Sequence, residues 1–185
     1  TGLNNANLFG MHPAGTGAAD ENVMPAKSTA KLAYHLLKDH PEVLETSKIT
    51  EKTFREGTDD KIEMSNWNFM LPGLVFEYEG VDGLKTGTTD LAGYCFTGTA
   101  ERDGTRLIAV VMKAVDSQGV GSYEARFDAT AKLFDYGFNQ FKKQEFIPAN
   151  YVVEDQKSIP VTKGKEDSVG IATKDDLSFM VKSSD

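Results

Sequence analysis

The sequence predicts a mixed α/β fold of the α+β type, built on an antiparallel sheet and followed by the start of a small all-β domain. Three observations support this. Residues 84–113 contain three strand-like runs in succession, an amphipathic helix follows from Ser122, and short β-branched runs between polar turns occupy residues 149–185. The expected domains are residues 1–147 and 148–185.

Composition and charge exclude several classes of protein. The 185 residues are 39% hydrophobic and 26% charged, which is typical of a globular chain and not of a disordered or fibrous one. With 20 Lys and Arg against 28 Asp and Glu, the net charge is −8, so the chain lacks the basic surface that nucleic-acid binding needs. No apolar run approaches the roughly 20 residues of a membrane span.

The strands of the predicted sheet are residues 84–89, 93–102 and 105–113. Asp103-Gly104 lies between the last two, and an Asp-Gly pair between β-branched runs is a strong hairpin signal. Residues 107–112 are apolar throughout, which indicates a central strand covered on both faces. Two further strands are expected at residues 48–56 and 61–66, joined by a turn.

Helices are expected before and after these strands. The first 23 residues read as a loop, Pro25 can start a helix that runs to Asp39, and Pro41 can start a short second helix ending at Glu45. Ser122 can cap a later helix with an aromatic stripe that packs on the sheet. The stripe comprises Phe127, Ala131, Phe134, Phe138 and Phe141. Residues 151–153, 158–161 and 169–172 read as short strands.

The Cys and His residues predict neither a metal nor another cofactor. Cys95 is the one cysteine, so an internal disulfide and a multi-thiolate zinc site are excluded. Its apolar neighbours predict a buried, inert thiol, with a thiol nucleophile as the alternative. His12, His35 and His40 lack metal-ligand spacing and are expected to be structural or solvated.

The Lys-Thr-Gly tripeptide of residues 85–87 is the candidate functional motif, because it lies on a predicted strand within the string VDGLKTGTTDLAGY. A strand at the edge of a cleft can pair with an extended peptide. Lys85 would then attract the carboxylate of the peptide's last residue, and Thr86 would add a hydroxyl. Gly87 leaves room for close approach, and the backbone N–H of Thr88 could face a developing oxyanion. The alternative is that Lys85 is a solvated cation at a strand end.

This string resembles the serine-type D-alanyl-D-alanine carboxypeptidases among the low-molecular-mass penicillin-binding proteins, in the form found in Gram-positive spore-formers. In enzymes that recognise penicillin through an active-site serine, Lys-Thr-Gly occupies such a strand. The likeness extends from Thr1-Gly2-Leu3 to about Phe141. It also rests on residues 66–71 (NWNFML), residues 93–100 (GYCFTGTA) and Arg126. The chain resembles the C-terminal part of such an enzyme.

The resemblance implies a fold and an activity. The fold is that of β-lactamases and DD-peptidases, an antiparallel sheet with helices on both faces, here incomplete and followed by a β-rich domain. The activity is removal of the terminal D-alanine from peptidoglycan stem pentapeptides through an acyl-serine intermediate. The resemblance also implies that β-lactam antibiotics bind and acylate the same serine. The expected location is the extracellular face of the cytoplasmic membrane, or secretion, with a C-terminal membrane anchor that lies outside this chain.

The resemblance also implies roles for particular residues. Lys85, Thr86 and Thr88 are expected to act in catalysis. The expected substrate-binding residues are Lys85, Thr86, Gly87, Thr88, Thr89 and Arg126. From its own position, Arg126 lies near the start of the aromatic-faced helix, where a guanidinium can hold a carboxylate in bidentate fashion. The alternative for Arg126 is a surface ion pair with a residue one helical turn away.

The expected nucleophile has no good candidate in this chain. The family needs Ser-x-x-Lys and Ser-x-Asn upstream of the Lys-Thr-Gly strand. Ser28-Thr29-Ala30-Lys31 matches the first motif, but about one such match is expected by chance, and no Ser-x-Asn separates it from Lys85. We therefore interpret Ser28 as an ordinary helix serine and expect the nucleophile in an N-terminal part of the protein that is missing here.

Two other functions share some of these features. A β-lactamase would use the same strand and fold, although the β-rich tail after Pro148 argues against it. A non-catalytic peptidoglycan-binding module could keep the Lys85 strand as a docking edge. The preferred hypothesis is a carboxypeptidase fragment that binds the anionic end of the substrate.

Overall fold

The structure is a computed structural model that describes residues 23–183, so the predicted N-terminal loop and His12 lie outside the described residues. The chain divides into two compact units, residues 1–137 and 138–185. The first unit contains the three-stranded sheet and its helices, and the second unit contains two short β ribbons. The domain boundary expected after residue 147 remains a prediction.

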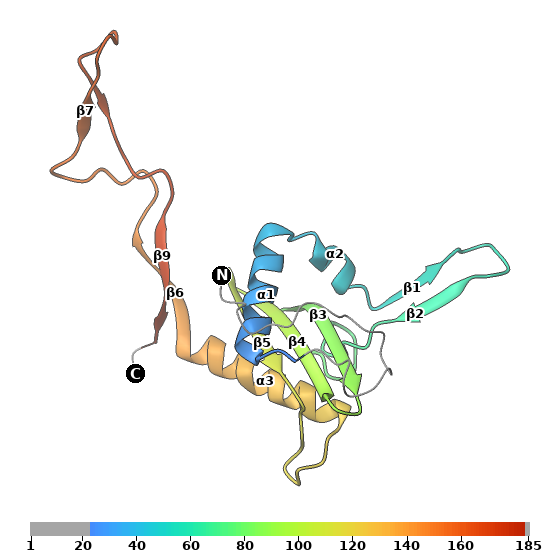
Figure 1. Ribbon diagram of the computed structural model, residues 1–185. Coiled ribbons are helices and arrows are strands. Elements are labelled where there is room, and N and C mark those ends of the chain that lie inside the picture. Colours follow the sequence, from blue (N-terminus) through green and yellow to red (C-terminus); the bar gives the residue numbers. More distant parts are fainter. Residues whose placement is uncertain (1–22, 184–185) are drawn as a thin grey trace. The chain divides into compact units, whose positions relative to one another are not determined.

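The central sheet is antiparallel in the order β3 (Val81–Thr89), β4 (Gly93–Arg102) and β5 (Thr105–Val111), which confirms the three predicted strands. The prediction that the third strand is central is wrong, because among residues 23–183 β5 pairs only with β4 and lies at an edge. Asp103 and Gly104 both have positive φ, 48° and 71°, which is the backbone of the tight turn that joins β4 to β5. β3 begins at Val81, three residues earlier than expected, because Val81 pairs with Ala100 ahead of a register shift. Figure 1 shows the three strands side by side.

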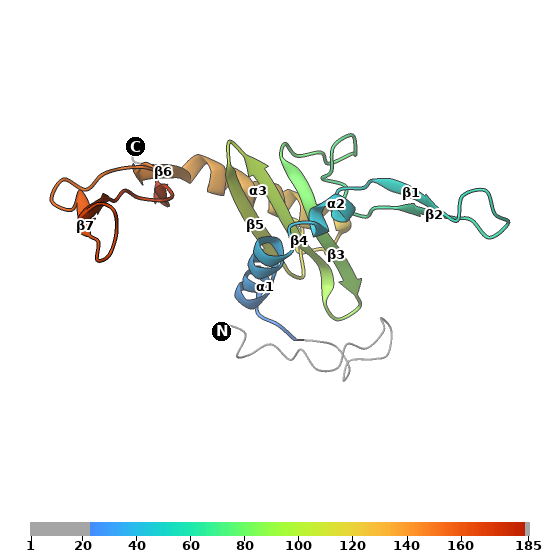
Figure 2. The same ribbon diagram turned by 90° about the horizontal axis from the view of Figure 1, so that it is seen from above.

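Helices cover both faces of this sheet, which confirms the expected fold class. α1 (Ala26–Asp39) lies against β5 and β4 and buries Ala33 and Leu37. α3 (Tyr123–Gln140) covers the opposite face, where Phe127 packs edge-on against Phe96 with 5.5 Å between ring centroids. Figure 2 shows the sheet between the two helices. These aromatic contacts form the core of the first unit.

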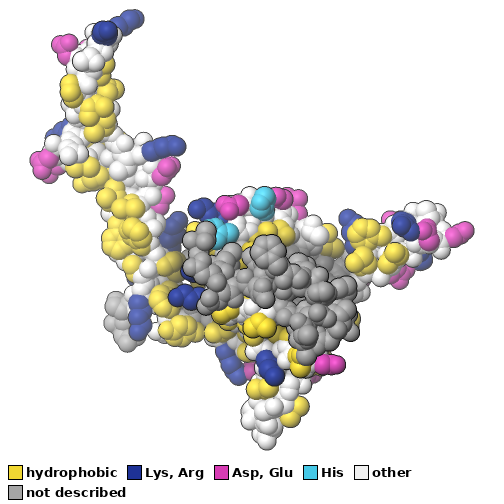
Figure 3. Space-filling view, in the orientation of Figure 1, with side chains coloured by type: hydrophobic (Ala, Val, Ile, Leu, Met, Phe, Trp, Pro, Cys, Tyr) yellow, Lys and Arg dark blue, Asp and Glu magenta, His cyan; other side chains and the backbone are white. Residues whose placement is uncertain are grey.

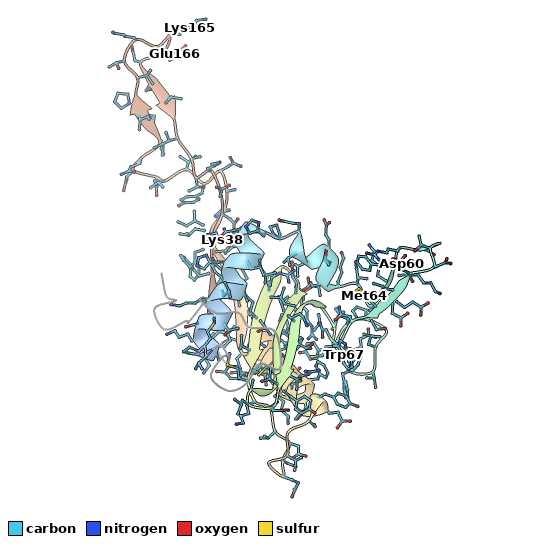
Figure 4. All side chains as sticks on the ribbon, turned by 45° about the vertical axis from the view of Figure 1, so that its right-hand side comes forward. Lys38, Asp60, Met64, Trp67, Lys165 and Glu166 are labelled. Atoms are coloured by element: carbon cyan, nitrogen blue, oxygen red, sulfur yellow. The ribbon has the colours of Figure 1, made fainter. Side chains whose placement is uncertain are left out.

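The short elements of the first unit differ slightly from their predicted ranges. α2 (Val43–Ser47) begins two residues after Pro41, because the amide of Val43 bonds to the carbonyl of His40 in a turn. β1 (Glu51–Phe54) and β2 (Ile62–Ser65) form the predicted hairpin, but with only four residues each. Figure 3 shows hydrophobic side chains exposed on this hairpin, and Figure 4 places Met64 on it and Asp60 at its turn.

The second unit is β-rich, as predicted, and two of the three predicted strands, residues 158–161 and 169–172, lie at or next to observed strands. β6 (Phe141–Ile147) pairs with β9 (Leu177–Lys182), and β7 (Ser158–Pro160) pairs with β8 (Ser168–Gly170). The predicted helical stripe through Phe141 is wrong at its end, because Phe141 belongs to β6. The strand predicted at residues 151–153 is also wrong. Phe141 departs from the predicted helix because it pairs with Lys182 of β9, a distant partner that local sequence patterns do not indicate.

No helix within residues 23–183 combines the length and the apolar character that crossing a membrane requires.

Close packing between β4 and α3 gives a stability prediction for Gly98. A Cβ at Gly98 would lie 2.8 Å from Cε1 of Phe96 and 3.2 Å from Cγ2 of Thr130, and both neighbours are buried. We expect Gly98→Ala to destabilise the intact protein by about 1–3 kcal/mol through overpacking. Gly87→Ala is the matched control, because no described atom lies within 4 Å of its added Cβ. Urea unfolding midpoints measure the difference, and equal midpoints for the two variants would contradict this account of the packing.

Tyr78 gives a prediction about stability at alkaline pH. Its hydroxyl donates to Oδ1 of Asp135 at 2.7 Å, and burial together with this hydrogen bond raises the pKa of Tyr78 to about 12. The unfolded chain loses this proton near pH 10 whereas the folded chain keeps it, so the free energy of unfolding should fall as the pH rises from about 10 to 12. Tyr78→Phe should remove this part of the alkaline loss. Chemical unfolding at pH 9 and pH 11 measures it, and an unchanged pH dependence in the variant would contradict the assignment.

Candidate functional site

The Lys-Thr-Gly residues lie in β3 at one edge of the sheet. β4 pairs with one side of β3, and among residues 23–183 no strand pairs with the other side. The pairing from Leu84 opposite Gly98 to Thr89 opposite Gly93 is regular. An open strand edge of this kind can accept an extended peptide through backbone hydrogen bonds.

Strand alternation divides the motif between the two faces of the sheet. Thr86 and Thr88 pair with Phe96 and Tyr94, and this is the face that packs on α3. Lys85 leaves β3 on the opposite face, where it is exposed and its Nζ donates to the carbonyl oxygen of Thr86 at 2.8 Å. Lys85 therefore supplies its charge from one face of β3, while the two threonine hydroxyls lie on the other.

Arg126 is the residue that α3 brings to this strand. The hydroxyl of Ser122 caps the helix by accepting from the amide of Ala125 at 3.1 Å, which confirms the predicted cap. Phe127 fixes the helix on the sheet, and the adjacent Arg126 is only 3% exposed. Nη1 of Arg126 donates to Oγ1 of Thr88 at 3.2 Å. The Lys-Thr-Gly strand and the start of α3 are thus in contact through Thr88 and Arg126.

Among the described residues, the charge of Arg126 has no counter-ion. Its guanidinium carbon lies 5.8 Å from the ring centroid of Tyr94 and 4.8 Å from that of Phe127. Within the described part of the chain, no carboxylate forms an ion pair with it and its Nε has no hydrogen-bond partner. Burial lowers the pKa of Arg126 from its ordinary value. The alternative of a surface ion pair is therefore wrong, and the site is suited to an anion.

Gly87 and Thr89 take different positions in the strand. No described atom lies within 4 Å of a Cβ built on Gly87, so no described part of the chain fills the space in front of this residue. The hydroxyl of Thr89 accepts from the amide of Ala92 at 3.0 Å and so holds the turn between β3 and β4.

Ser28 does not have the surroundings of a nucleophile paired with Lys31. Ser28 is in the first turn of α1 and is only 7% exposed, whereas Lys31 is exposed. An activated serine needs its base within hydrogen-bond reach and access to substrate. Because Ser28 is buried and Lys31 is exposed, the structure agrees with the interpretation of Ser28 as an ordinary helix serine.

The two asparagines of the NWNFML segment bond to backbone carbonyls, one at the start of β3 and the others near the end of α2. Asn68 is buried, and its Nδ2 donates to the carbonyl oxygen of Gly83 at 3.4 Å. Nδ2 of Asn66 donates to the carbonyl oxygens of Ser47 and Ile49, both at 2.9 Å. Trp67 between them is exposed and lies at the base of the hairpin in Figure 4.

Arg106 is a residue that sequence reasoning missed. It lies in β5 and forms a bidentate ion pair with Asp82, and it also bonds to Glu101. Glu101 is thus a paired residue of β4. The sequence did contain a signal for this contact. A tight hairpin at Asp103-Gly104 places Arg106 opposite Glu101, and opposite charges at facing positions indicate an ion pair.

The titratable residues that the structure describes do not form a metal site. Across residues 23–183, no group of three His, Cys, Asp or Glu side chains is placed to hold a metal ion. His35 and His40 are exposed, beside Asp39 and Glu42 respectively. Cys95 is half-buried, less buried than expected, and its Sγ lies 3.4 Å from the carbonyl oxygen of Ala92.

Comparisons with known proteins identify the family of this chain. Residues 1–116 match the model of the peptidase S11 family, described as D-alanyl-D-alanine carboxypeptidase. The chain is 31% identical over 168 residues to the D-alanyl-D-alanine carboxypeptidase DacF of Bacillus subtilis, covering 90% of this chain and 40% of that protein. It is 33% identical to DacA of Haemophilus influenzae, over 84% of this chain and 36% of that protein.

Solved structures of penicillin-binding proteins are similar to this chain in fold and sequence. PBP3 of Streptococcus pneumoniae, a peptidoglycan synthesis regulatory factor, aligns with a TM-score of 0.74 and 34% identity over 90% of this chain and 45% of that chain. Penicillin-binding protein D2 of Listeria monocytogenes in its ampicillin-bound form aligns with a TM-score of 0.54 and 39% identity, over 67% and 46% of the two chains. The chain spans less than half the length of these relatives. By its sequence and its fold, it belongs to the D-alanyl-D-alanine carboxypeptidase family of peptidases, S11.

Proposed function

We propose that this chain is the part of a serine-type D-Ala-D-Ala carboxypeptidase that binds the anionic end of the substrate. The enzyme would remove the terminal D-alanine from peptidoglycan stem pentapeptides through an acyl-serine intermediate. The observation that carries the proposal is the buried guanidinium of Arg126, which bonds to Thr88 on the Lys-Thr-Gly strand and has no acidic partner among the described residues.

A substrate carboxylate would satisfy this arrangement. Burying a cation without a partner is costly, and a bidentate carboxylate offsets that cost through charge-assisted hydrogen bonds. Thr88 and Thr86 offer hydroxyls on the same face of β3, and the ammonium of Lys85 adds a second positive charge at this strand of an otherwise acidic chain. Each contact favours a peptide that ends in a free carboxylate.

The open edge of β3 would hold the rest of the peptide. An extended stem peptide can add to this edge as a strand, with the space in front of Gly87 receiving it. The backbone N–H of Thr88 would then stabilise the oxyanion that forms as the serine attacks. Together these residues bind and orient the substrate and stabilise the developing charge.

The acylated serine would come from a part of the protein outside this chain. The exported location follows from the substrate, because peptidoglycan lies outside the cytoplasm. Secretion or attachment through a C-terminal membrane anchor is part of the same proposal. A β-lactamase is not favoured, because the family and the curated relatives are carboxypeptidases.

Labelled penicillin tests the division between binding and covalent chemistry. We expect it to acylate the intact protein and to leave the isolated chain of residues 1–185 unlabelled, because Ser28 is buried in α1. Gel fluorescence and mass spectrometry of the labelled peptide give the readout. Acylation of Ser28 in the isolated chain would contradict the proposal, and Ser28→Ala identifies that site.

Replacing the ammonium of Lys85 tests its role in the intact protein. We expect Lys85→Gln to lower kcat/KM for D-alanine release by about 10- to 100-fold, since a hydrogen bond to a charged group contributes about 1.5–3 kcal/mol. Lys132→Gln is the control, because Lys132 is exposed on α3 and pairs with the exposed Asp128. Release of D-alanine from a peptide ending in D-Ala-D-Ala measures the effect. Equal kcat/KM for both variants would show that Lys85 is a solvated cation.

A further inference from the structure

Three side chains converge on Asp82 and Gly83, just before the Lys-Thr-Gly residues. Arg106 of β5 donates from Nη1 and Nη2 to the two carboxylate oxygens of Asp82, each at 2.8 Å. The hydroxyl of Ser47 donates to the carbonyl oxygen of Asp82 at 3.0 Å, and Asn68 reaches the carbonyl oxygen of Gly83. The start of β3 is thus held by groups from β5, from α2 and from the loop that precedes β3.

Asp82 is also the position at which the register of β3 changes. Val81 pairs with Ala100 and Gly83 pairs with Thr99, so Asp82 is an extra residue with no partner on β4. An extra residue of this kind is a β-bulge, and bulges next to functional sites commonly re-aim the side chains that follow. The pairing downstream of Gly83 depends on this one inserted residue.

The bulge determines which face of the sheet each residue of the motif occupies. With it, Lys85 pairs with Thr97, while Thr86 pairs with Phe96 on the side of α3. Without it, every later residue would shift by one position, and Lys85 would stand opposite Phe96 instead. A shift of one residue moves each side chain to the other face. Thr88 would then turn away from Arg126, and Lys85 would point into the aromatic core.

Arg106 is placed to keep the bulge in position. Its side chain and that of Asp82 are each 26% exposed, so their ion pair is partly shielded from water and has the bidentate geometry that gives the strongest such contacts. Nη1 of Arg106 also donates to the hydroxyl of Thr99 at 2.9 Å, and Thr99 is the β4 partner of Gly83. The hydrogen bond to Asp82 is the main cause of the raised pKa of Arg106. One guanidinium therefore holds the bulged residue and the adjacent position of β4.

We propose that Arg106 is a positioning residue that sets the register of the substrate-binding strand through its ion pair with Asp82. It touches neither substrate nor the reacting atoms, and its effect on turnover rests on the function proposed above. Its role is to keep Lys85 on one face of β3 and Thr86 and Thr88 on the other.

The experiment uses the intact protein with Arg106→Gln, Asp82→Asn, the double variant and Arg106→Lys. Arg55→Gln is the matched control, because Arg55 forms an exposed ion pair with Asp60 in the β1–β2 turn. We expect each single variant to slow acylation by labelled penicillin at least 10-fold per folded molecule, and the double variant to be no slower than the singles. Arg106→Lys should recover part of the rate, because an ammonium keeps the charge but not the bidentate contact.

Hydrogen exchange gives a second readout that does not need activity. We expect Arg106→Gln to speed amide exchange in residues 84–88 at least 10-fold while residues 105–111 keep their protection. Exchange that rises equally in both segments, with an unchanged acylation rate per folded molecule, would show a merely structural role and overturn the proposal. If the wild-type protein neither binds penicillin nor releases D-alanine, the proposed function fails, and the exchange comparison still decides whether Arg106 sets the register.

Discussion

The hydrogen bond from Arg126 to Thr88 joins the two elements on which the site depends. It connects the start of α3 to the Lys-Thr-Gly strand, and it does so from a buried guanidinium that has no counter-ion among the described residues. The aromatic contact between Phe127 and Phe96 holds the helix at the distance that permits it. Packing in the core thus places a cation where a substrate carboxylate would offset the cost of its burial.

Strand geometry then distributes the remaining groups. Because side chains alternate along β3, a single register places Thr86 and Thr88 on the face that packs on α3, where Thr88 bonds to Arg126, and places Lys85 on the other face. Among the described residues no strand pairs with the outer edge of β3, and in the proposed function this edge would take the backbone of a peptide. Under the proposed function, binding of an anionic peptide end would require the core, the register and the free edge together. The bulge at Asp82 links the register to β5.

Much of this arrangement could be predicted from local sequence. Asp103-Gly104 between β-branched runs predicts the β4–β5 hairpin, and the Ser122 cap with its aromatic stripe predicts the helix that carries Arg126. These signals are local, because a turn and a cap depend on neighbouring residues. The Lys-Thr-Gly motif is similarly visible, since its strand context is part of the same short segment.

Features that depend on distant pairing were missed. The end of α3 and the start of β6 at Phe141 depend on β9, whose residues are far along the chain. The ion pair between Asp82 and Arg106 connects β3 to β5 across β4. It depends on a bulge that no pattern of residues predicted. The absence of any described atom within 4 Å of a Cβ built on Gly87 depends on the tertiary fold, so local sequence patterns could not predict it.

Discrimination between a free and a blocked peptide terminus tests the role of Arg126 most directly. The measurement compares kcat/KM of the intact protein for a D-Ala-D-Ala peptide and for its C-terminal amide, in wild type and in Arg126→Gln. We predict that wild type prefers the free carboxylate by at least 10-fold and that Arg126→Gln loses most of this preference, since the charge-assisted contact is then absent. An undiminished preference in Arg126→Gln would contradict the account.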